Sequence, residues 1–440
     1  MNWQQLLSPQ RLDQKPDSTE PSRSAFEQDY DRIIFSHPFR RLQDKTQVHP
    51  LPEHDFVHTR LTHSLEVSSV GRSLGKRVGE VILQRHSQLE KDFSLFDFGA
   101  IVAAASLAHD LGNPPFGHAG EDALSDFFLH HSQGQAFKNK VSEGEWNDLI
   151  KFEGNAQGFR ILNKKQYGLK LTAATLGAFT KYPCPAFFTE RDKSKKSQKK
   201  FGFFKSEEEY FKKAANQLGL VSLGNNSWCR HPLAFLVEAA DDICYSIIDL
   251  EDGCRLGLVS FDDTVQMMAA ILGDQFNSEK LKKHISLNEK LGVLRALVIG
   301  KLVDECTALF LDQEEAILNG TFDSALTDVC NSKNALDNIS KISIEKIYHS
   351  RNVVEIEASG HEVLPGLLQE FILAGFHLVD SGQSRKYANL SLLFPEEVRW
   401  AILQDPSNTY SVLRQVIDFV SGLTDRHALS LFRRIKGISL

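Results

Sequence analysis

AAASLAHDLGNPPFGHAGEDAL, residues 103–124, joins an apolar run to a turn that carries several chemically useful side chains. The apolar run is typical of a buried helix, and it ends in the adjacent pair His109-Asp110. Gly112 and the Pro-Pro pair that follows it interrupt the helix. A second helix is expected next, with His118 at its start and Glu121 within its first turn. The stretch therefore predicts two helices that meet at a turn suited to metal binding and proton transfer.

The pair His109-Asp110 offers an imidazole and a carboxylate, and both groups bind divalent metals in proteins. Successive residues of a helix point about 100° apart. The two side chains can therefore hold one ion only where the helix is ending, which is where the Leu-Gly-Asn-Pro-Pro break places them. The alternative is that they only cap the end of a helix. A metal site requires further ligands from elsewhere in the chain.

Two other segments supply candidate ligands. Residues 59–67, TRLTHSLEV, begin a helix on which Arg60 and His63 are three residues apart and share a face. Residues 235–249 form an apolar helix in which Asp241, Tyr245 and Asp249 follow one stripe at a spacing of four. Buried carboxylates are costly unless a cation or hydrogen-bond donors meet them. The alternative for these acids is a solvated helix face.

The order His63, His109-Asp110, Asp241 resembles the metal-binding set of the HD-domain phosphohydrolases. Five ordered motifs resemble, more narrowly, the bacterial deoxyguanosine triphosphate triphosphohydrolases. They are RRLQDKTQV (40–48), TRLTHSLEV (59–67), HDLGNPPFGHAGE (109–121), FEGNAQ (152–157) and EAADDI (238–243). The segment GLTDRHA (422–428) is also similar to that family, and the resemblance runs from about residue 26 to the C-terminus.

The resemblance implies an all-α, mainly helical HD-domain fold and a divalent metal held by His63, His109, Asp110 and Asp241. Such a ligand set suits Mn, Mg, Co, Ni, Fe or Zn, and the order of affinities alone does not choose among them. In the family, water attacks the α-phosphorus and intact triphosphate leaves. The resemblance makes His118 the acid that protonates the leaving oxygen, with Glu121 fixing its tautomer.

Six further residues are candidates for substrate binding, some from the resemblance and some from spacing. Arg60 and Lys181 are placed to contact phosphate, and the resemblance assigns Gln47 to the sugar or base. Asn155 either contacts the ligand or caps a helix. Tyr245 and Asp249 are expected to read the sugar, with the tyrosine ring excluding a 2′-hydroxyl and the carboxylate accepting from the 3′-hydroxyl.

The composition narrows the class of protein and its compartment. The chain has 440 residues, of which 42% are hydrophobic and 24% charged, as in ordinary globular proteins. A net charge of −7 argues against a generally basic nucleic-acid binder. The six cysteines contain no CxxC pair, the N-terminus lacks a signal-peptide pattern, and no apolar run approaches membrane-spanning length. These features indicate a cytoplasmic protein that does not enter a membrane.

We expect one large helical domain over residues 25–440, preceded by a flexible arm at 1–24. The HD core is expected at about 58–250 and a C-terminal helical part at about 260–440. The lysine-rich insertion at 183–205 is interpreted as a solvated loop, with contact to nucleic acid or a nucleotide phosphate as the alternative. β-Branched residues within 343–357 predict a short pair of strands.

The sequence thus predicts metal-dependent hydrolysis of deoxynucleoside triphosphates, either with dGTP preferred or with a broader range, to deoxynucleoside and inorganic triphosphate. Two alternatives stay open. One is an HD-type phosphohydrolase that acts on another nucleotide, and the other is a non-catalytic regulator that binds nucleotide or single-stranded DNA. Family resemblance also implies a homo-oligomer, often a hexamer, and leaves room for single-stranded DNA or a dNTP as an effector.

Overall fold

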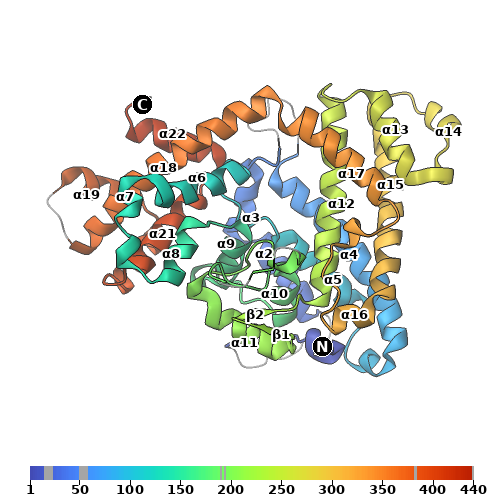
Figure 1. The fold of residues 1–440 in the computed structure, drawn as a ribbon, viewed down its shortest axis with the longest axis horizontal. Helices are drawn as coiled ribbons and strands as arrows, with labels where there is room; N and C mark the ends of the chain where they lie inside the picture. Colours follow the sequence, from blue (N-terminus) through green and yellow to red (C-terminus); the bar gives the residue numbers. More distant parts are fainter. Residues whose placement is uncertain (14–22, 49–57, 189–190, 193–194, 381–383, 439–440) are drawn as a thin grey trace.

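The computed structural model describes residues 1–13, 23–48, 58–188, 191–192, 195–380 and 384–438. Over these residues the chain forms 22 α-helices and several short 3₁₀ turns. It also forms one pair of short antiparallel strands, of three and two residues. Figure 1 shows how these elements are arranged. The prediction of an all-α fold is confirmed.

The helices of the first half are α1 (Trp3–Leu6), α2 (Ala25–Ile34), α3 (His37–Arg41), α4 (Arg60–Arg85), α5 (Leu95–Ala108), α6 (Gly117–His130), α7 (Ser132–Gln135), α8 (Glu143–Ile150), α9 (Gly154–Asn163), α10 (Ala173–Phe179) and α11 (Glu208–Leu218). The antiparallel strands β1 (Ser222–Gly224) and β2 (Ser227–Trp228) follow. The second half comprises α12 (Pro232–Arg255), α13 (Phe261–Leu272), α14 (Ser278–Lys282), α15 (Leu287–Asp312), α16 (Glu314–Leu318), α17 (Lys333–Ile342), α18 (Arg351–Asp380), α19 (Arg385–Ser391), α20 (Glu396–Gln404), α21 (Thr409–Ser421) and α22 (Asp425–Ile435).

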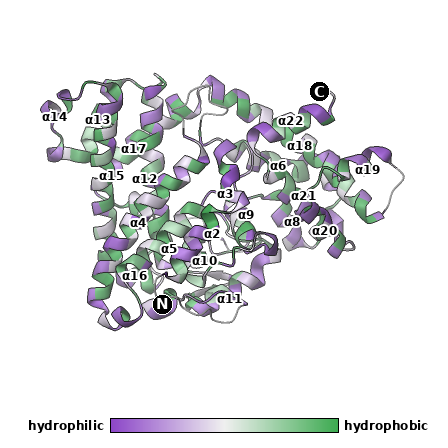
Figure 2. Ribbon diagram, turned by 180° about the vertical axis from the view of Figure 1, so that it is seen from behind, coloured by the Kyte–Doolittle hydropathy of each residue, from purple (hydrophilic) through white to green (hydrophobic). Residues whose placement is uncertain are grey.

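The pair α4 and α5 lies at the centre of the site-bearing half of the molecule. A stripe of Gly71, Gly75 and Gly79 on α4 faces α5, and a Cβ atom on Gly75 would lie only 2.7 Å from the carbonyl oxygen of Phe98. The glycines therefore allow the two helix backbones to approach closely. Helix α5 is buried along nearly all of its length, and apolar residues gather in the central helices around it (Figure 2). The end of α5 is thus held firmly where the His109-Asp110 pair begins.

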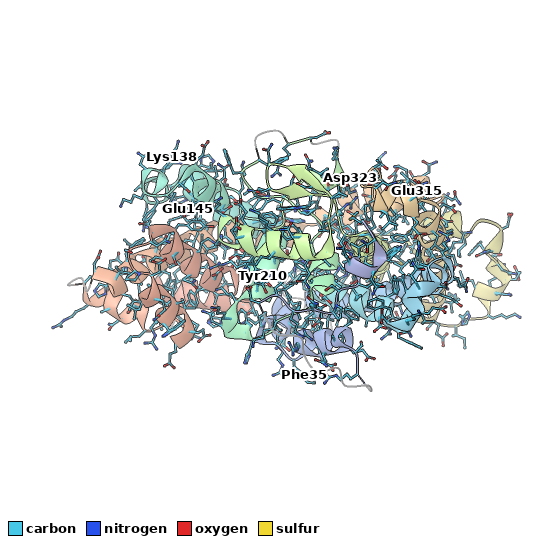
Figure 3. The ribbon with its side chains drawn as sticks, turned by 90° about the horizontal axis from the view of Figure 1, so that it is seen from below. Phe35, Lys138, Glu145, Tyr210, Glu315 and Asp323 are labelled. Carbon is cyan, nitrogen blue, oxygen red and sulfur yellow. The ribbon has the colours of Figure 1, made fainter. Side chains whose placement is uncertain are left out.

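The described helices build two main hydrophobic cores. The first core joins α2, α4, α5, α10, α12 and α15, and its members include Leu74, Phe98, Val102, Leu236, Ile243 and Leu302. The second core joins α6, α8, α18, α20 and α21, and its members include Phe127, Phe128, Leu364, Leu368, Phe371 and Val416. Figure 3 shows the same division from below, with Lys138 and Glu145 on the side of the second core and Glu315 on the side of the first.

Each core draws helices from both sides of the interval between about residues 250 and 260. Helices α13, α15 and α17 pack into the first core, whereas α6 and α8 pack against helices that begin more than 200 residues later. Hydrophobic periodicity identifies the apolar face of each helix but not the partner that covers it. The chain passes from one core to the other at the turn between α5 and α6.

The expected strands within 343–357 are absent from the structure, which is described throughout that segment. Ser343–Tyr348 forms a π-helical turn, and α18 begins at Arg351. Val353 and Ile356 are three residues apart and face the same cavity from one side of the helix. Burial against this helical surface outweighs the weak β-propensity of the branched side chains.

Helix α18 is the one described helix that is long and apolar enough to cross a membrane. Its apolar residues Leu364, Leu367, Leu368 and Phe371 are buried in the second core. The length and composition of α18 are therefore those of a central core helix.

The N-terminal segment differs from the expected flexible arm over the residues that the structure describes. Trp3, Leu6 and Leu7 are buried in the first core, and the indole nitrogen of Trp3 donates to Glu314 at 2.9 Å. Arg11 is buried against Asp29, with 2.5 Å between guanidinium and carboxylate. The polar composition concealed these few anchoring residues. The rest of the predicted arm, 14–22, lies outside the described residues.

The insertion at 183–205 is likewise not a solvated loop where it is described. Phe201, Phe203 and Phe204 are buried, and Phe201 and Phe204 pack with Cys184 and Ala186 in a small third cluster. The hydroxyl of Ser197 donates to Asp323 at 2.7 Å. The lysines suggested solvation, but the aromatic residues at the end of the insertion fasten it to the body of the protein.

Candidate active site

The four predicted metal ligands converge from three helices. His63 lies in the first turn of α4, His109-Asp110 directly follows α5, and Asp241 is on α12. His63 Nε2 is 3.2 Å from Asp241 Oδ1, and His109 Nε2 is 3.5 Å from both Asp110 Oδ1 and Asp241 Oδ1. Donor atoms of His63, His109 and Asp110 all lie within 4.8 Å of one another.

Contacts within the turn after α5 orient the side chains of His109 and Asp110. His109 Nδ1 is 2.7 Å from the carbonyl oxygen of Ser106, and the Asn113 amide donates to Asp110 Oδ1 at 2.6 Å. A Cβ atom on Gly112 would lie 2.0 Å from the carbonyl oxygen of Gly154, so only glycine fits against α9 here. The backbone of the turn is therefore held by α9 on one side and by its own side chains on the other.

The ligand set fits a divalent metal. A neutral His109 that donates from Nδ1 to a backbone carbonyl presents the lone pair of Nε2 to the cluster. That Nε2 atom is buried and has no hydrogen-bond partner among the described residues, as expected for a metal-binding nitrogen. Two imidazoles and two carboxylates are ligands that divalent transition metals accept.

Both carboxylates of the cluster favour the ionised form. Burial opposes ionisation of Asp110 and Asp241, but the imidazoles of His109 and His63 outweigh it and hold both pKa values below the usual range. Arg60 adds to this effect at Asp110, because its Nη1 atom donates to Asp110 Oδ2 at 2.8 Å. Both carboxylates are therefore ionised and can bind a cation.

His118 and Glu121 form a separate pair at the start of α6. Their side chains are joined by a 2.7 Å contact between Nδ1 and Oε2, and the backbone amide of Gly154 donates to Glu121 Oε1 at 2.6 Å. The contact with Glu121 raises the pKa of His118, while the His118 imidazole and Lys200 lower the pKa of Glu121 against the effect of its burial. The His118 side chain is 79% exposed and faces the cavity, so it is free to meet a ligand.

One cavity of about 450 Å³ contains the metal cluster and the His118–Glu121 pair. This volume is within the range of small-molecule sites. Three cationic side chains line it: Arg60, Lys181 and Lys200. Lys181 pairs with Glu238 at 3.3 Å, and Lys200 with Glu153 at 3.4 Å. A polyanion entering the cavity would compete with these carboxylates for the ammonium groups.

Three of the residues predicted to contact the sugar or base also line this cavity. Gln47 lines the cavity, and its Oε1 atom is buried without a partner among the described residues. The Tyr245 ring lies against Tyr348, with 5.6 Å between centroids. Asn155 also lines the cavity; its amide donates to Glu153, which caps α9, so Asn155 itself is not the cap.

Asp249 is the one substrate-binding candidate that the structure does not bring to the cavity surface. It is 4% exposed and accepts a 2.9 Å hydrogen bond from the Tyr348 hydroxyl. Burial raises the pKa of Asp249 to about 8. The helical stripe shared with Asp241 placed it on the correct side of α12, but Tyr348 lies between it and the ligand space.

Sequence reasoning missed three residues of this cavity. Tyr348 arrives from the π-helical turn, which has no recognisable sequence signal. Lys200 belongs to the insertion interpreted as solvated, where its position among several lysines did not distinguish it. Glu153 stands inside the quoted FEGNAQ motif, which was the available signal for it.

Lys45, in the motif RRLQDKTQV, is buried although it stands among polar and basic residues. It is 3% exposed, and its ammonium donates to the carbonyl oxygens of Asn113 and Ser421 at 2.5 and 3.0 Å. Burial lowers its pKa to about 7. Lys45 therefore attaches its segment to both the α5–α6 turn and the end of α21.

Comparison with known proteins agrees with this fold. The HD domain model matches residues 60–150, and the model of the phosphohydrolase-associated domain matches residues 331–434. The helical fold with a His/Asp cluster on α4, α5 and α12 thus defines an HD-domain phosphohydrolase, and the protein is an enzyme.

Relatives of full length specify the family. The chain is 43% identical to a deoxyguanosinetriphosphate triphosphohydrolase-like protein of Synechocystis and 39% identical to one of Pseudomonas aeruginosa. It is 32% identical to a deoxyguanosinetriphosphate triphosphohydrolase of Yersinia pestis. Each match covers at least 99% of both chains. The chain belongs to the deoxyguanosinetriphosphate triphosphohydrolase family.

Proposed function

We propose that this enzyme hydrolyses deoxynucleoside triphosphates to deoxynucleoside and inorganic triphosphate, with dGTP preferred or within a broader range. The observation that carries the proposal is that the four-residue cluster and the His118–Glu121 pair open into one cavity lined with cations. The name of the Yersinia pestis relative supports the same reaction. An acid separate from the ligand cluster is what departure of an alkoxide leaving group requires.

His63, His109, Asp110 and Asp241 would hold a divalent metal, of which Mn and Mg are the first candidates. When bound there, the metal supplies Lewis-acid polarisation of a phosphate oxygen and lowers the pKa of water. The remaining chemistry is assigned to the protein's own side chains.

In the proposed reaction, a water oxygen bonds to the α-phosphorus and the bond between that phosphorus and the 5′-oxygen breaks. His118 donates its proton from Nε2 to the departing 5′-oxygen, while Glu121 keeps Nδ1 engaged. Arg60, Lys181 and Lys200 bind the phosphates, with the planar guanidinium suited to two phosphate oxygens at once. The products are a deoxynucleoside and triphosphate that carries the water oxygen.

Sugar and base selection is assigned to other residues that line the cavity. The Tyr245 ring excludes a 2′-hydroxyl, and the unpartnered Oε1 of Gln47 accepts from the sugar or base. Asn155 is assigned to contact with the bound nucleotide. Asp249 is assigned an indirect role, because it holds the hydroxyl of Tyr348, which lines the cavity. We further propose a cytoplasmic homo-oligomer, with a hexamer as the specific form and single-stranded DNA or a dNTP as candidate effectors; sedimentation measurements with and without each effector test this.

The decisive experiment incubates the purified protein with each dNTP and each rNTP in Mn²⁺ or Mg²⁺, in water enriched in ¹⁸O. Inorganic triphosphate from a dNTP, carrying the label and abolished by Asp110→Ala, is the expected result. Release of pyrophosphate or single phosphate would assign the enzyme to another HD-type reaction. Absence of turnover with every nucleotide, even with a second dNTP present, would reject the proposal.

A further inference from the structure

Two segments that reach the cavity from different parts of the chain meet at one buried carboxylate. Asp425, the first residue of α22, is 1% exposed. Its Oδ2 atom accepts from the backbone amide of Thr46 at 2.9 Å, and its Oδ1 atom accepts from the backbone amide of Phe116 at 3.2 Å. The two amides belong to segments that carry proposed substrate and proton contacts.

Each amide lies next to a residue assigned to the reaction. Thr46 directly precedes Gln47, whose side chain lines the cavity. Phe116 precedes Gly117 and His118, and both Phe116 and Gly117 have left-handed backbone conformations, with φ of 66° and 59°. A non-glycine residue is strained in that region. The hydrogen bond from Phe116 to Asp425 therefore holds a conformation that the chain would not favour by itself.

Further hydrogen bonds hold the same two segments against the end of α21 and the start of α22, a region called the junction below. Lys45 donates to the carbonyl oxygens of Asn113 and Ser421, and Arg41 donates to the carbonyl oxygen of Gly422 at 3.0 Å. Burial lowers the pKa of Lys45, and the charge of Asp425 opposes this change. A carboxylate is suited to the position because it accepts with both oxygens, whereas an amide of the same shape would direct a donor at one of the two N–H groups.

We propose that Asp425 is a positioning residue that sets Gln47 and His118 at the correct distance from one another across the cavity. This inference rests on the proposed function, because both residues have their roles there. Asp425 does not line the cavity, and it holds the two segments through the two backbone amides, beside the charges of Lys45 and Arg60. Helix α22 thereby positions His118 and Gln47, which lie more than 300 residues earlier in the sequence.

The test substitutes Asp425→Asn, with Asp44→Asn as the matched control. Asp44 makes contacts at the same junction, accepting from Thr424 Oγ1 at 2.8 Å and pairing with Arg426 at 3.1 Å, but it holds neither cavity amide. We expect Asp425→Asn to lower kcat by at least about tenfold and to raise KM. Asp44→Asn should leave both within about twofold, and Asp425→Glu should recover part of the lost activity.

Combination with His118→Ala separates positioning from general damage to the fold. If Asp425 acts through His118, Asp425→Asn lowers kcat by less than about twofold in the His118→Ala background while the rise in KM persists. A purely structural role would lower kcat by the same factor in both backgrounds and leave KM unchanged, which would overturn the proposal.

Hydrogen exchange gives a readout that does not depend on turnover. In Asp425→Asn we expect faster exchange at the amides of Thr46 and Phe116 and no change in the central helices α4 and α5. Unchanged exchange at both amides would overturn the positioning role even if activity fell. If the unaltered protein releases no triphosphate from any dNTP, the proposed function fails, and the exchange result still decides whether Asp425 holds the two segments.

Discussion

The contact between His118 and Glu121 bears on the pH range over which His118 could act as the proposed acid. Glu121 raises the pKa of His118, so the protonated imidazole persists to higher pH than it would alone. A reaction that needs this proton slows as the pH rises through the pKa of His118. Loss of the Glu121 charge would move that decline to lower pH.

We therefore expect Glu121→Gln to shift the alkaline limb of the kcat profile towards lower pH and to reduce kcat by roughly 10²-fold at neutral pH. The measurement is triphosphate release from the preferred dNTP across the pH range. Glu209→Gln, which makes the same change on an exposed part of α11, is the control and should leave the profile in place. An unshifted alkaline limb in Glu121→Gln would remove His118 as the acid.

The ring of Tyr245 provides a second prediction about a single side chain. Its replacement by alanine removes the surface proposed to exclude a 2′-hydroxyl, so Tyr245→Ala should narrow the preference for dNTP over rNTP by roughly 10- to 100-fold. Competition between dGTP and GTP measures this ratio. Tyr245→Phe keeps the ring and should retain the preference, and equal discrimination by all three proteins would contradict the assignment.

Helix α12, which carries Asp241, is tied to the N-terminal segment by one neutral histidine. His231 caps α12, accepting from the amide of Leu233 at 3.1 Å, and its other ring nitrogen bonds the carbonyl oxygen of Leu6 at 3.0 Å. A protonated imidazole has no acceptor for the Leu233 amide. Burial accordingly lowers the pKa of His231 to about 4 from the ordinary value of 6.5.

This lowered pKa predicts a loss of stability in mild acid. Above pH 6.5 both the folded and unfolded states hold His231 neutral. Between pH 6.5 and 4 only the unfolded state binds the proton, so the free energy of unfolding falls, by roughly 3 kcal/mol in total from this residue.

Chemical denaturation at several pH values measures the effect as a difference between the unaltered protein and His231→Asn. Asparagine preserves a side-chain cap but does not titrate, so the variant should be less stable at pH 7.5 and should lose less stability towards pH 4. Parallel curves for the two proteins would show that His231 does not contribute to the acid sensitivity.

The sequence predicted those elements whose signal is local. Helices α5 and α12 follow from their apolar pattern, and the turn between α5 and α6 follows from Gly112 and the prolines. The cluster of His63, His109, Asp110 and Asp241 could be proposed because its motifs stand in a familiar order. The place of Tyr348 and Lys200 in the cavity, and the two amides that Asp425 of the segment GLTDRHA holds, depend on long-range packing that hydrophobic periodicity does not encode. The same limitation explains the error over 343–357, where side-chain type suggested strands and tertiary burial produced helix.

The molecule as a whole should respond to metal, because the four ligands join three helices of the first core. A ligand that binds only the folded state raises its stability by about 2.7 kcal/mol at a hundred times its Kd. Mn²⁺ should therefore raise the Tm of the unaltered protein by several degrees, and chelation should reverse the rise. Asp110→Ala should show little shift, and an equal rise in both proteins would place the stabilising ion elsewhere.

The two hydrophobic cores are interleaved along the chain, and this arrangement affects how the protein is made. Helices α6 and α8 leave the ribosome well before α18 and α21, which cover their apolar faces. A chain released before α18 would expose Phe127 and Phe128 to water and would lack Asp425 beside the His118 turn. The first core can begin to pack during synthesis, whereas the turn that carries His118 gains its contact with Asp425 only after α22 has begun to form. Nascent and truncated chains are therefore expected to be both inactive and prone to aggregation.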